Sequence, residues 1–268
     1  MNTLDNQYQY LLREVLEQGN NKEDRTGTGV LSLFGRTIRH KMADGFPILT
    51  TKKVAFNTMM TELKWFLKGD TNIKYLHDNN CKIWDGDYEK SGRTDGWLGK
   101  IYGHQWRKLS LFGVQYDQIK TLIKGLKENP DSRRHLVNSW NVYDLDNMTL
   151  PPCHYSFQCY VADGKLSLIW NQRSADLFLG VPFNISSYGL LLLLLCEETG
   201  YKPGELIGNL ADVHLYKNHL NQASYQLTRK PYDLPEIDLI YRDIYTGDFD
   251  AKLINYKSHP SIKAPLSN

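Results

Sequence analysis

The tripeptide Ala162-Asp163-Gly164 limits the possible folds of this sequence more than any other feature, because it joins two strand-like segments. Asp-Gly pairs favour the tight turns that connect antiparallel strands. The flanking segments, 153–161 and 165–172, alternate or run apolar, as strands do. The sequence therefore predicts a hairpin in which Cys153 lies opposite or diagonal to Arg173.

The rest of the sequence mixes helical and strand-like periodicity in one continuous chain. No internal repeat, low-complexity tract or long linker marks a boundary. We therefore predict one α+β domain over residues 1–268. The predicted helices are 7–17, 56–67, 114–126, 186–199 and 214–227, and the other predicted extended segments are 30–38, 135–140 and 206–213.

The run Leu190–Leu195 is the most apolar stretch of the chain. A helix that crosses a bilayer needs roughly 20 apolar residues, whereas this run is short and is followed by Glu197 and Glu198. We predict a helix buried in the protein core. The N-terminus, from Met1 to Asp5, lacks the basic and apolar regions of a signal peptide. We therefore expect a cytoplasmic protein without a membrane partner.

The formal net charge of +2 gives no reason to expect broad binding to nucleic acid or to anionic membranes. An anion site in such a protein must be local and built from a few placed arginines. The cysteines form no CxxC pair and no zinc-finger spacing, so we expect neither a disulfide framework nor a metal site. They are Cys81, Cys153, Cys159 and Cys196.

Cys153 is the candidate nucleophile. A reactive thiol needs a cationic neighbour or a helix N-terminus to lower its pKa, and the predicted hairpin supplies Arg173. The alternative is a structural role, because free cysteine is among the most buried residue types.

Further blocks of sequence, spread along almost the whole chain, are together far more specific than any single motif. They are Asp24–Gly29, Phe46–Lys53, Glu62–Ile73, Ile83–Asp85, Tyr102–Arg107, Asp131–Arg134, Pro152–His154, Gln172–Ser174 with Asp176, Pro182–Ile185, and Asp212–Tyr216. In their order and spacing these blocks resemble the thymidylate synthase family, which also includes nucleotide hydroxymethylases. The resemblance implies a large twisted mixed β-sheet flanked by helices, with one sheet face used for homodimerisation. It also implies that dUMP is the substrate, that 5,10-methylenetetrahydrofolate is the co-substrate, and that neither a metal nor DNA takes part.

In that resemblance Cys153 adds to carbon 6 of uracil, which makes carbon 5 nucleophilic. Asn184 stabilises the developing enolate, because its amide donates to the carbonyl at carbon 4 and accepts from the ring NH. Aspartate at this position would suit cytosine better. Without the resemblance, Asn184 after Pro182 reads as a turn residue.

Phosphate recognition falls to arginines, whose guanidinium forks fit phosphate oxygens. The implied set is Arg25, Arg173 and Ser174, with Arg133 and Arg134 supplied by the partner subunit; on its own, such an arginine pair is more often solvated. The resemblance assigns His214 and Tyr216 to the deoxyribose hydroxyl, although such residues more often pack in a half-buried position. Gln172 and Asp176 complete the implied nucleotide site.

Glu62 is the implied general acid and base, and its place at the margin of an apolar helix face predicts a raised pKa. Otherwise it would be an ordinary rim glutamate. Tyr102 helps to shape the cavity, and His154 orders water near the pyrimidine. The implied folate site consists of Ile83, Trp84, Asp176, Leu179 and Gly180; Trp84 alone would be read as a core residue.

The sequence departs from the common family pattern mainly on the folate side. Gly86 and Asp87 replace the usual Glu-Trp, Leu210-Ala211 replaces a glycine pair, and the chain ends in the polar Ser267-Asn268. Poorer exclusion of water would favour hydroxymethylation of dUMP, so this activity remains the alternative to methylation. A non-catalytic nucleotide- or RNA-binding relative is a second alternative, disfavoured by the presence of Cys153, Glu62 and Asn184.

Overall fold

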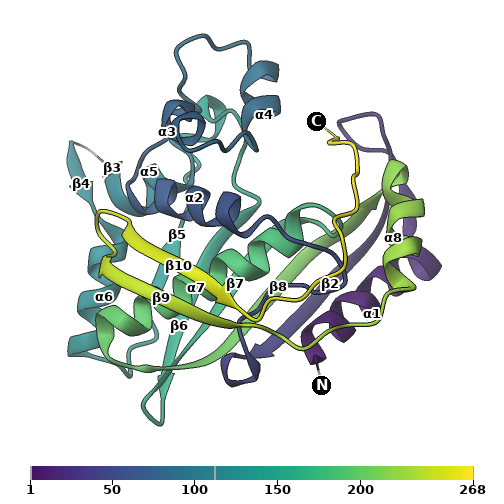
Figure 1. Cartoon of the computed structure of the whole chain (residues 1–268). Coiled ribbons are helices and arrows are strands. Elements are labelled where there is room, and N and C mark those ends of the chain that lie inside the picture. The colour runs from purple at the N-terminus through teal and green to yellow at the C-terminus, as the bar shows by residue number, and fades with distance from the viewer. Residues whose placement is uncertain (1, 112, 268) are drawn as a thin grey trace.

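A computed structural model, which describes residues 2–111 and 113–267, has a six-stranded mixed sheet at its centre (Figure 1). Neighbouring strands are antiparallel, except that β7 and β8 are parallel. The α+β class with a large mixed sheet flanked by helices is confirmed. In spatial order the strands are β1 (Asn20–Lys22), β2 (Val30–Lys41), β8 (Lys202–Tyr216), β7 (Lys165–Asp176), β6 (His154–Ala162) and β5 (Leu136–Asn138).

The predicted hairpin joins β6 to β7. Asp163 and Gly164 both adopt positive φ, 50° and 69°, which is the backbone of the tight turn that Asp-Gly favours. The register of the two strands shifts between His154 and Ser156. Cys153, the residue directly before β6, then lies opposite β7, where the Arg173 amide donates to its carbonyl at 2.9 Å. The predicted pairing of Cys153 with Arg173 is confirmed.

Helix α7 (Gly180–Thr199) connects β7 to the parallel strand β8 and packs against both strands. By length and composition it could cross a membrane, but 67% of its most apolar window is buried inside the protein. The leucine run is therefore part of the core, as predicted. The helix begins at Gly180, before the predicted Ser186, because Pro182 lies in the first turn, where proline is tolerated.

The remaining elements surround this framework. Helices α2 to α5 lie together on one side of the sheet, whereas α1 and α8 pack at the other end (Figure 1). The helices are α1 (Thr3–Gln18), α2 (Phe56–Leu67), α3 (Ile73–Asp78), α4 (Asp85–Lys90), α5 (Tyr102–Lys108), α6 (Gln118–Glu128) and α8 (Leu220–Leu227), with short 3-10 turns η1 (Met42–Asp44), η2 (Leu145–Asn147) and η3 (Lys217–His219). Two hairpins, β3 (Leu109–Leu111) with β4 (Val114–Tyr116) and β9 (Glu236–Asp243) with β10 (Asp248–Ile254), complete the fold.

Two helices are predicted to start too early in the chain. The segment 114–116 forms β4, and α6 begins only at Gln118, because Asp117 caps the helix by accepting from the Lys120 amide. Strand β8 continues to Tyr216 through its pairing with β2, so the next helix starts at Leu220 and not at His214. In both cases strand pairing overrides the helical spacing of apolar residues.

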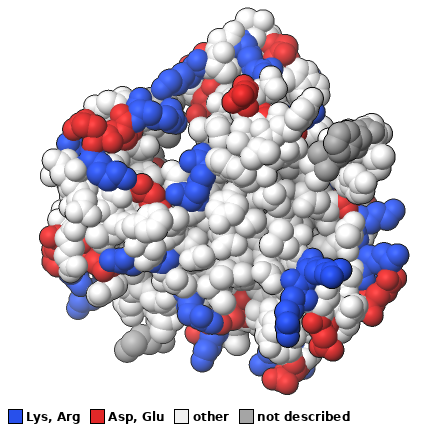
Figure 2. Space-filling view, turned by 180° about the vertical axis from the view of Figure 1, so that it is seen from behind, with Lys and Arg blue, Asp and Glu red and all other residues white. Residues whose placement is uncertain are grey.

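The face of the sheet opposite α7 carries several exposed apolar side chains. Phe34 on β2 is 81% exposed and Tyr160 on β6 is 68% exposed. Seen from behind, the molecule shows a broad central area with few charged residues (Figure 2). Exposed apolar area of this kind marks an interaction surface more often than a solvated one.

Candidate active site

Three neighbouring strands bring the predicted nucleotide residues together. Cys153 precedes β6 and pairs with Arg173 on β7. Ser174, the residue after Arg173 on β7, is the register partner of Asp212 on β8. Two residues further along, Asp176 is the register partner of His214. The predicted nucleophile, an arginine and the residues predicted to bind the sugar thus follow one another across the sheet.

The Cys153 backbone is held from both sides. Its amide donates to the Tyr102 hydroxyl at 2.7 Å, and its carbonyl accepts from the Arg173 amide at 2.9 Å. The thiol is half-buried and hydrogen-bonds with Ser174. The side chain is therefore fixed next to β7 while it keeps access to solvent.

The expected ionisation of this thiol is wrong for the free protein. Burial raises the pKa of Cys153 above its ordinary value, and the opposing effects of Arg173, Ser174 and Arg25 do not overcome burial. The Arg173 guanidinium instead donates to the Pro152 and Pro151 carbonyls at 2.9 and 2.8 Å. The thiol is thus protonated at neutral pH before a nucleotide is bound.

The Asn184 carboxamide is oriented by Gln172. Gln172 Nε2 donates to Asn184 Oδ1 and to the Ser174 carbonyl, both at 3.0 Å, while its Oε1 accepts from the Trp170 indole. Because Asn184 Oδ1 is the atom that accepts, Nδ2 is left as a donor and Oδ1 keeps a second lone pair. This orientation gives the donor and acceptor that the edge of a uracil ring requires.

Glu62 on α2 faces this region beside Trp84, whose indole donates to Glu62 Oε1 at 2.8 Å. Burial raises the pKa of Glu62 to about 7, and the Trp84 hydrogen bond only partly opposes the rise. The raised pKa predicted from the sequence is present. A carboxyl group with such a pKa exchanges protons readily near neutral pH.

These groups and their order along the chain agree with one family of enzymes. A sequence model described as thymidylate synthase matches residues 6–268. The chain belongs to the thymidylate synthase family. It is therefore an enzyme of the thymidylate synthase kind, which modifies dUMP by one-carbon transfer from a folate.

His154 lies beside the nucleophile in an aromatic cluster. Its ring stacks on Tyr102 with centroids 4.3 Å apart, and its Nδ1 lies 2.9 Å from the Tyr188 hydroxyl. Burial lowers the pKa of His154 to about 3, so the imidazole is neutral. Sequence reasoning did not identify Tyr188, because a tyrosine in a leucine-rich helix looks like a core residue.

The predicted folate residues of the family occupy two places. Leu179 and Gly180 begin α7 beside Asp176, whose Oδ1 accepts from the Leu179 amide at 3.2 Å. Ile83 and Trp84 lie on the other wall, directly before α4. Lys52, which no sequence motif marks as a site residue, is buried and donates to the Phe178 carbonyl, and burial lowers its pKa to about 7.

The loop predicted to bind phosphate lies between β1 and β2 and carries the exposed Arg25. Asp24 shapes this loop, because its carboxylate accepts from the Gly29 amide at 2.8 Å and from the Thr26 amide at 3.0 Å. Gly27 and Gly29 have φ of 73° and 74°, a conformation that favours glycine. Arg25 is therefore presented on a preformed turn.

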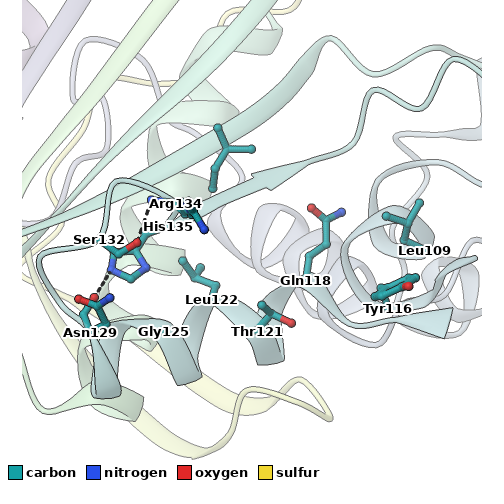
Figure 3. Close-up of a pocket in the computed structure, with 11 residues that line it drawn as sticks. Leu109, Tyr116, Gln118, Thr121, Leu122, Gly125, Asn129, Ser132, Arg134 and His135 are labelled. Carbon is teal, nitrogen blue, oxygen red and sulfur yellow. Dashed lines mark hydrogen bonds between the residues drawn. The ribbon is translucent and has the colours of Figure 1, made fainter. Parts of the chain in front are cut away.

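Arg133 and Arg134 lie apart from this group. Both are exposed on the segment between α6 and β5. Leu136 pairs with Gln158, which is five residues beyond Cys153, so the arginines lie beyond a point roughly 16 Å along the strand from Cys153. Arg134 instead lines a separate cavity of about 500 Å³ beside α6, together with His135 (Figure 3). Within one chain these two arginines do not join the candidate site.

Proposed function

We propose that the protein methylates dUMP reductively to dTMP, with 5,10-methylenetetrahydrofolate as donor of the carbon and of the hydride. The observation that carries this proposal is the hydrogen-bonded frame formed by consecutive residues of β7. Gln172 orients the base-reading Asn184, Arg173 pairs with Cys153, and Ser174 contacts the thiol. One strand thereby sets the nucleophile against the base that it attacks.

The reaction begins with a bond between Cys153 sulfur and carbon 6 of uracil. Since burial keeps the thiol protonated in the free protein, its proton must pass to water as this bond forms. Arg173, Ser174 and Arg25 all favour the thiolate, and they act on the same sulfur. As the bond forms, charge moves to the oxygen at carbon 4, where Asn184 Nδ2 donates.

Glu62 serves as the proton carrier for the ring. With a pKa of about 7 it is present in both protonation states under neutral conditions. Trp84 is 6% exposed, and the hydrogen bond from its indole fixes the orientation of the Glu62 carboxyl group. Glu62 can therefore take the proton from carbon 5, or protonate oxygen 4, through water.

The folate supplies the methylene carbon and the hydride when it is bound. Asp176 fits the pterin, because it is half-buried and its Oδ1 is fixed by two backbone amides of the following turn. Trp84 and Leu179 supply apolar walls. These residues orient the folate and exclude water from the reacting carbon.

The site also requires a homodimer in this proposal. The sheet face with Phe34 and Tyr160 is exposed, and Arg133 and Arg134 lie too far from Cys153 to act in the same chain. A two-fold contact through this face brings the arginines of one subunit to the phosphate of the other. When inactive Cys153→Ser protein is mixed with the Arg133→Ala/Arg134→Ala double variant, we expect about one quarter of the wild-type activity, because half the dimers regain one intact site. No recovery in subunits shown to exchange would reject this arrangement.

Hydroxymethylation of dUMP is the second candidate, and Asp87 favours it. Asp87 replaces an aromatic residue of the family pattern, and its charge acts on both Cys153 and Arg25. A carboxylate on this wall attracts water towards the carbon that the folate delivers.

One assay distinguishes the candidates. Methylation converts the folate to dihydrofolate, which is followed by absorbance, whereas hydroxymethylation consumes dUMP and returns tetrahydrofolate. We expect dihydrofolate and dTMP in equal amounts. Consumption of dUMP without dihydrofolate would establish hydroxymethylation, and no consumption would reject both.

A further inference from the structure

The Asp212 carboxylate joins three strands beside the residues assigned to the sugar. Ser32 Oγ on β2 donates to its Oδ1 at 2.7 Å, and Lys22 Nζ on β1 lies 2.9 Å from its Oδ2. On its own strand, His214 Nδ1 lies 3.5 Å from Oδ1 and 3.1 Å from the Asp212 carbonyl oxygen. The Asp212 carboxylate takes no part in the proposed reaction steps.

The surroundings of His214 Nδ1 determine where the ring carries its proton. A carbonyl oxygen only accepts, and the Asp212 carboxyl group is ionised, because its hydrogen bonds with His214, Lys22 and Ser32 hold its pKa well below the ordinary value. A ring nitrogen that faces two acceptors must be the one that bears hydrogen. The proton therefore sits on Nδ1, and Nε2 is the ring atom left for a ligand.

The charged and titratable groups around His214 also favour its protonated form. Asp212 faces it from β8, Asp176 faces it from the paired position on β7, and the Tyr216 ring lies 5.3 Å away, edge-on. Burial lowers the pKa of His214, but Asp212 and Asp176 outweigh burial and raise it above the ordinary value. The Lys22 charge is compensated by Asp212. In the protonated form, Nε2 is a donor as well.

The same carboxylate anchors the loop that carries Arg25. Lys22 is the last residue of β1, directly before that loop. At the other end of the loop, the Lys217 amide donates to the Gly29 carbonyl at 3.0 Å, and Lys217 follows β8. Strand β8 therefore holds both ends of the loop and also carries the sugar-reading pair.

We propose that Asp212 is a positioning residue for recognition of the nucleotide 3′-hydroxyl: together with Lys22 and Ser32, it fixes the proton on His214 Nδ1. When Asp212 is changed, the loop that carries Arg25 keeps the hydrogen bond from the Lys217 amide to the Gly29 carbonyl. The role rests on the proposed function, with dUMP as the ligand and His214 as the residue that binds its sugar hydroxyl. Asp212 does not touch the nucleotide itself. It acts through His214, so its loss should weaken the binding of nucleotides that carry the 3′-hydroxyl.

The test compares two nucleotides by titration calorimetry without folate. In Asp212→Asn, dUMP binding should weaken by about tenfold, the value of one charge-assisted hydrogen bond. Binding of 2′,3′-dideoxy-UMP, which lacks the 3′-hydroxyl, should stay within about twofold of wild type. Equal weakening for both nucleotides, or none for either, would overturn the proposal. Asp248→Asn is the matched control, because it breaks the exposed Arg242–Asp248 pair at 3.0 Å on the β9–β10 hairpin.

Two further measurements guard against a merely structural effect. Nitrogen NMR of His214 should show hydrogen on Nδ1 in the wild type, and His214 should lose its proton at lower pH in Asp212→Asn. If the Asn variant does not fold, Ser32→Ala should weaken dUMP binding in the same selective way by about threefold, since one neutral hydrogen bond is lost. A wild type that binds no dUMP would reject the proposed function, whereas an Nδ1 without hydrogen would reject this inference alone.

Discussion

The two walls of the candidate site are built differently. On the nucleotide side, Cys153, Arg173 and Asn184 are attached to paired strands or to the first turns of a long helix, and each is held by hydrogen bonds. On the folate side, Asp87 belongs to the short helix α4, and none of its six residues, all of them described, is buried. Trp84 is the residue directly before this helix. The sequence departures lie mainly on this second wall.

The difference shows where this protein can vary without losing its chemistry. Substitutions in β7 would disturb a network in which Gln172 alone contacts Asn184, Ser174 and Trp170. Substitutions in α4 leave the sheet intact, because the hydrogen bonds of this segment run to other parts of the fold: Trp84 to Glu62, Asp85 to His77, and the Gly96 amide to the Tyr88 hydroxyl. We therefore expect variants of the nucleotide wall to abolish the reaction or to change its substrate. Variants of the folate wall should change whether hydride or water reaches the methylene intermediate.

The largest effect is expected at Cys153. Replacement by serine removes the nucleophile, since a hydroxyl group is far less ionised than a thiol, so turnover should be abolished. Binding of dUMP should remain measurable, because phosphate, sugar and base contacts are unchanged. Steady-state assays and calorimetry check the two statements separately. Retained turnover would remove Cys153 from the role of nucleophile.

Asn184→Asp tests the base-reading end of the same wall. An aspartate presents only acceptors when ionised, so it no longer donates to the carbonyl at carbon 4 of uracil but suits the amino group of cytosine. We expect kcat/KM for dUMP to fall by roughly 10²-fold and the preference to move towards dCMP. Competition between the two nucleotides measures the shift. Unchanged preference would show that Asn184 does not read the base.

Glu62→Gln tests the group that faces both walls. Loss of a general acid and base should lower kcat by about 10²-fold or more, and the limb of the pH–rate profile near pH 7 should disappear. Burial raises the pKa of Glu62 from 4.5 to about 7, so the folded protein disfavours the carboxylate, and this cost develops as the pH rises between these values. The glutamine variant should therefore gain thermal stability relative to wild type over that interval. If Glu62→Gln keeps the pH–rate profile of the wild type, and if the difference in Tm between the two proteins does not change with pH, Glu62 is not the general acid and base.

The sequence predicted the first wall better than the second, for physical reasons. The Asp163-Gly164 turn fixes a register, and from that register the approach of Cys153 to Arg173 follows without any tertiary information. The charge state of Cys153 did not follow, because it depends on how burial competes with three neighbours that come from different elements. The family resemblance supplied the role of Glu62, while its position on a helix face predicted the direction of its pKa shift.

Other errors have a similar origin. The segment 114–116 has the spacing of a helix, yet it pairs with β3, and its own residues do not indicate that pairing. Tyr188 and Lys52 were overlooked because a tyrosine beside leucines and a lysine in a polar block carry no sign of what they contact. The arginine pair 133–134 is no such error: the resemblance assigns it to the site of the partner subunit, and its place beyond Gln158 in the strand register leaves that assignment a prediction.

Asp87 is expected to give the smallest change in rate and the most informative change in product. If its carboxylate draws water to the folate wall, Asp87→Asn should lower any yield of 5-hydroxymethyl-dUMP by about threefold while total dUMP consumption stays within about twofold, because no contact to dUMP is removed. Chromatography of the nucleotides measures the ratio of the two products. Glu89→Gln, an exposed position of the same helix, is the matched control. Because the charge of Asp87 also raises the pKa of Cys153, its removal should move the thiol titration to lower pH, whichever product is formed. A product ratio that stays constant while the thiol titration moves would mean that Asp87 acts on the nucleophile alone, and the two walls would then be coupled through charge and not through water.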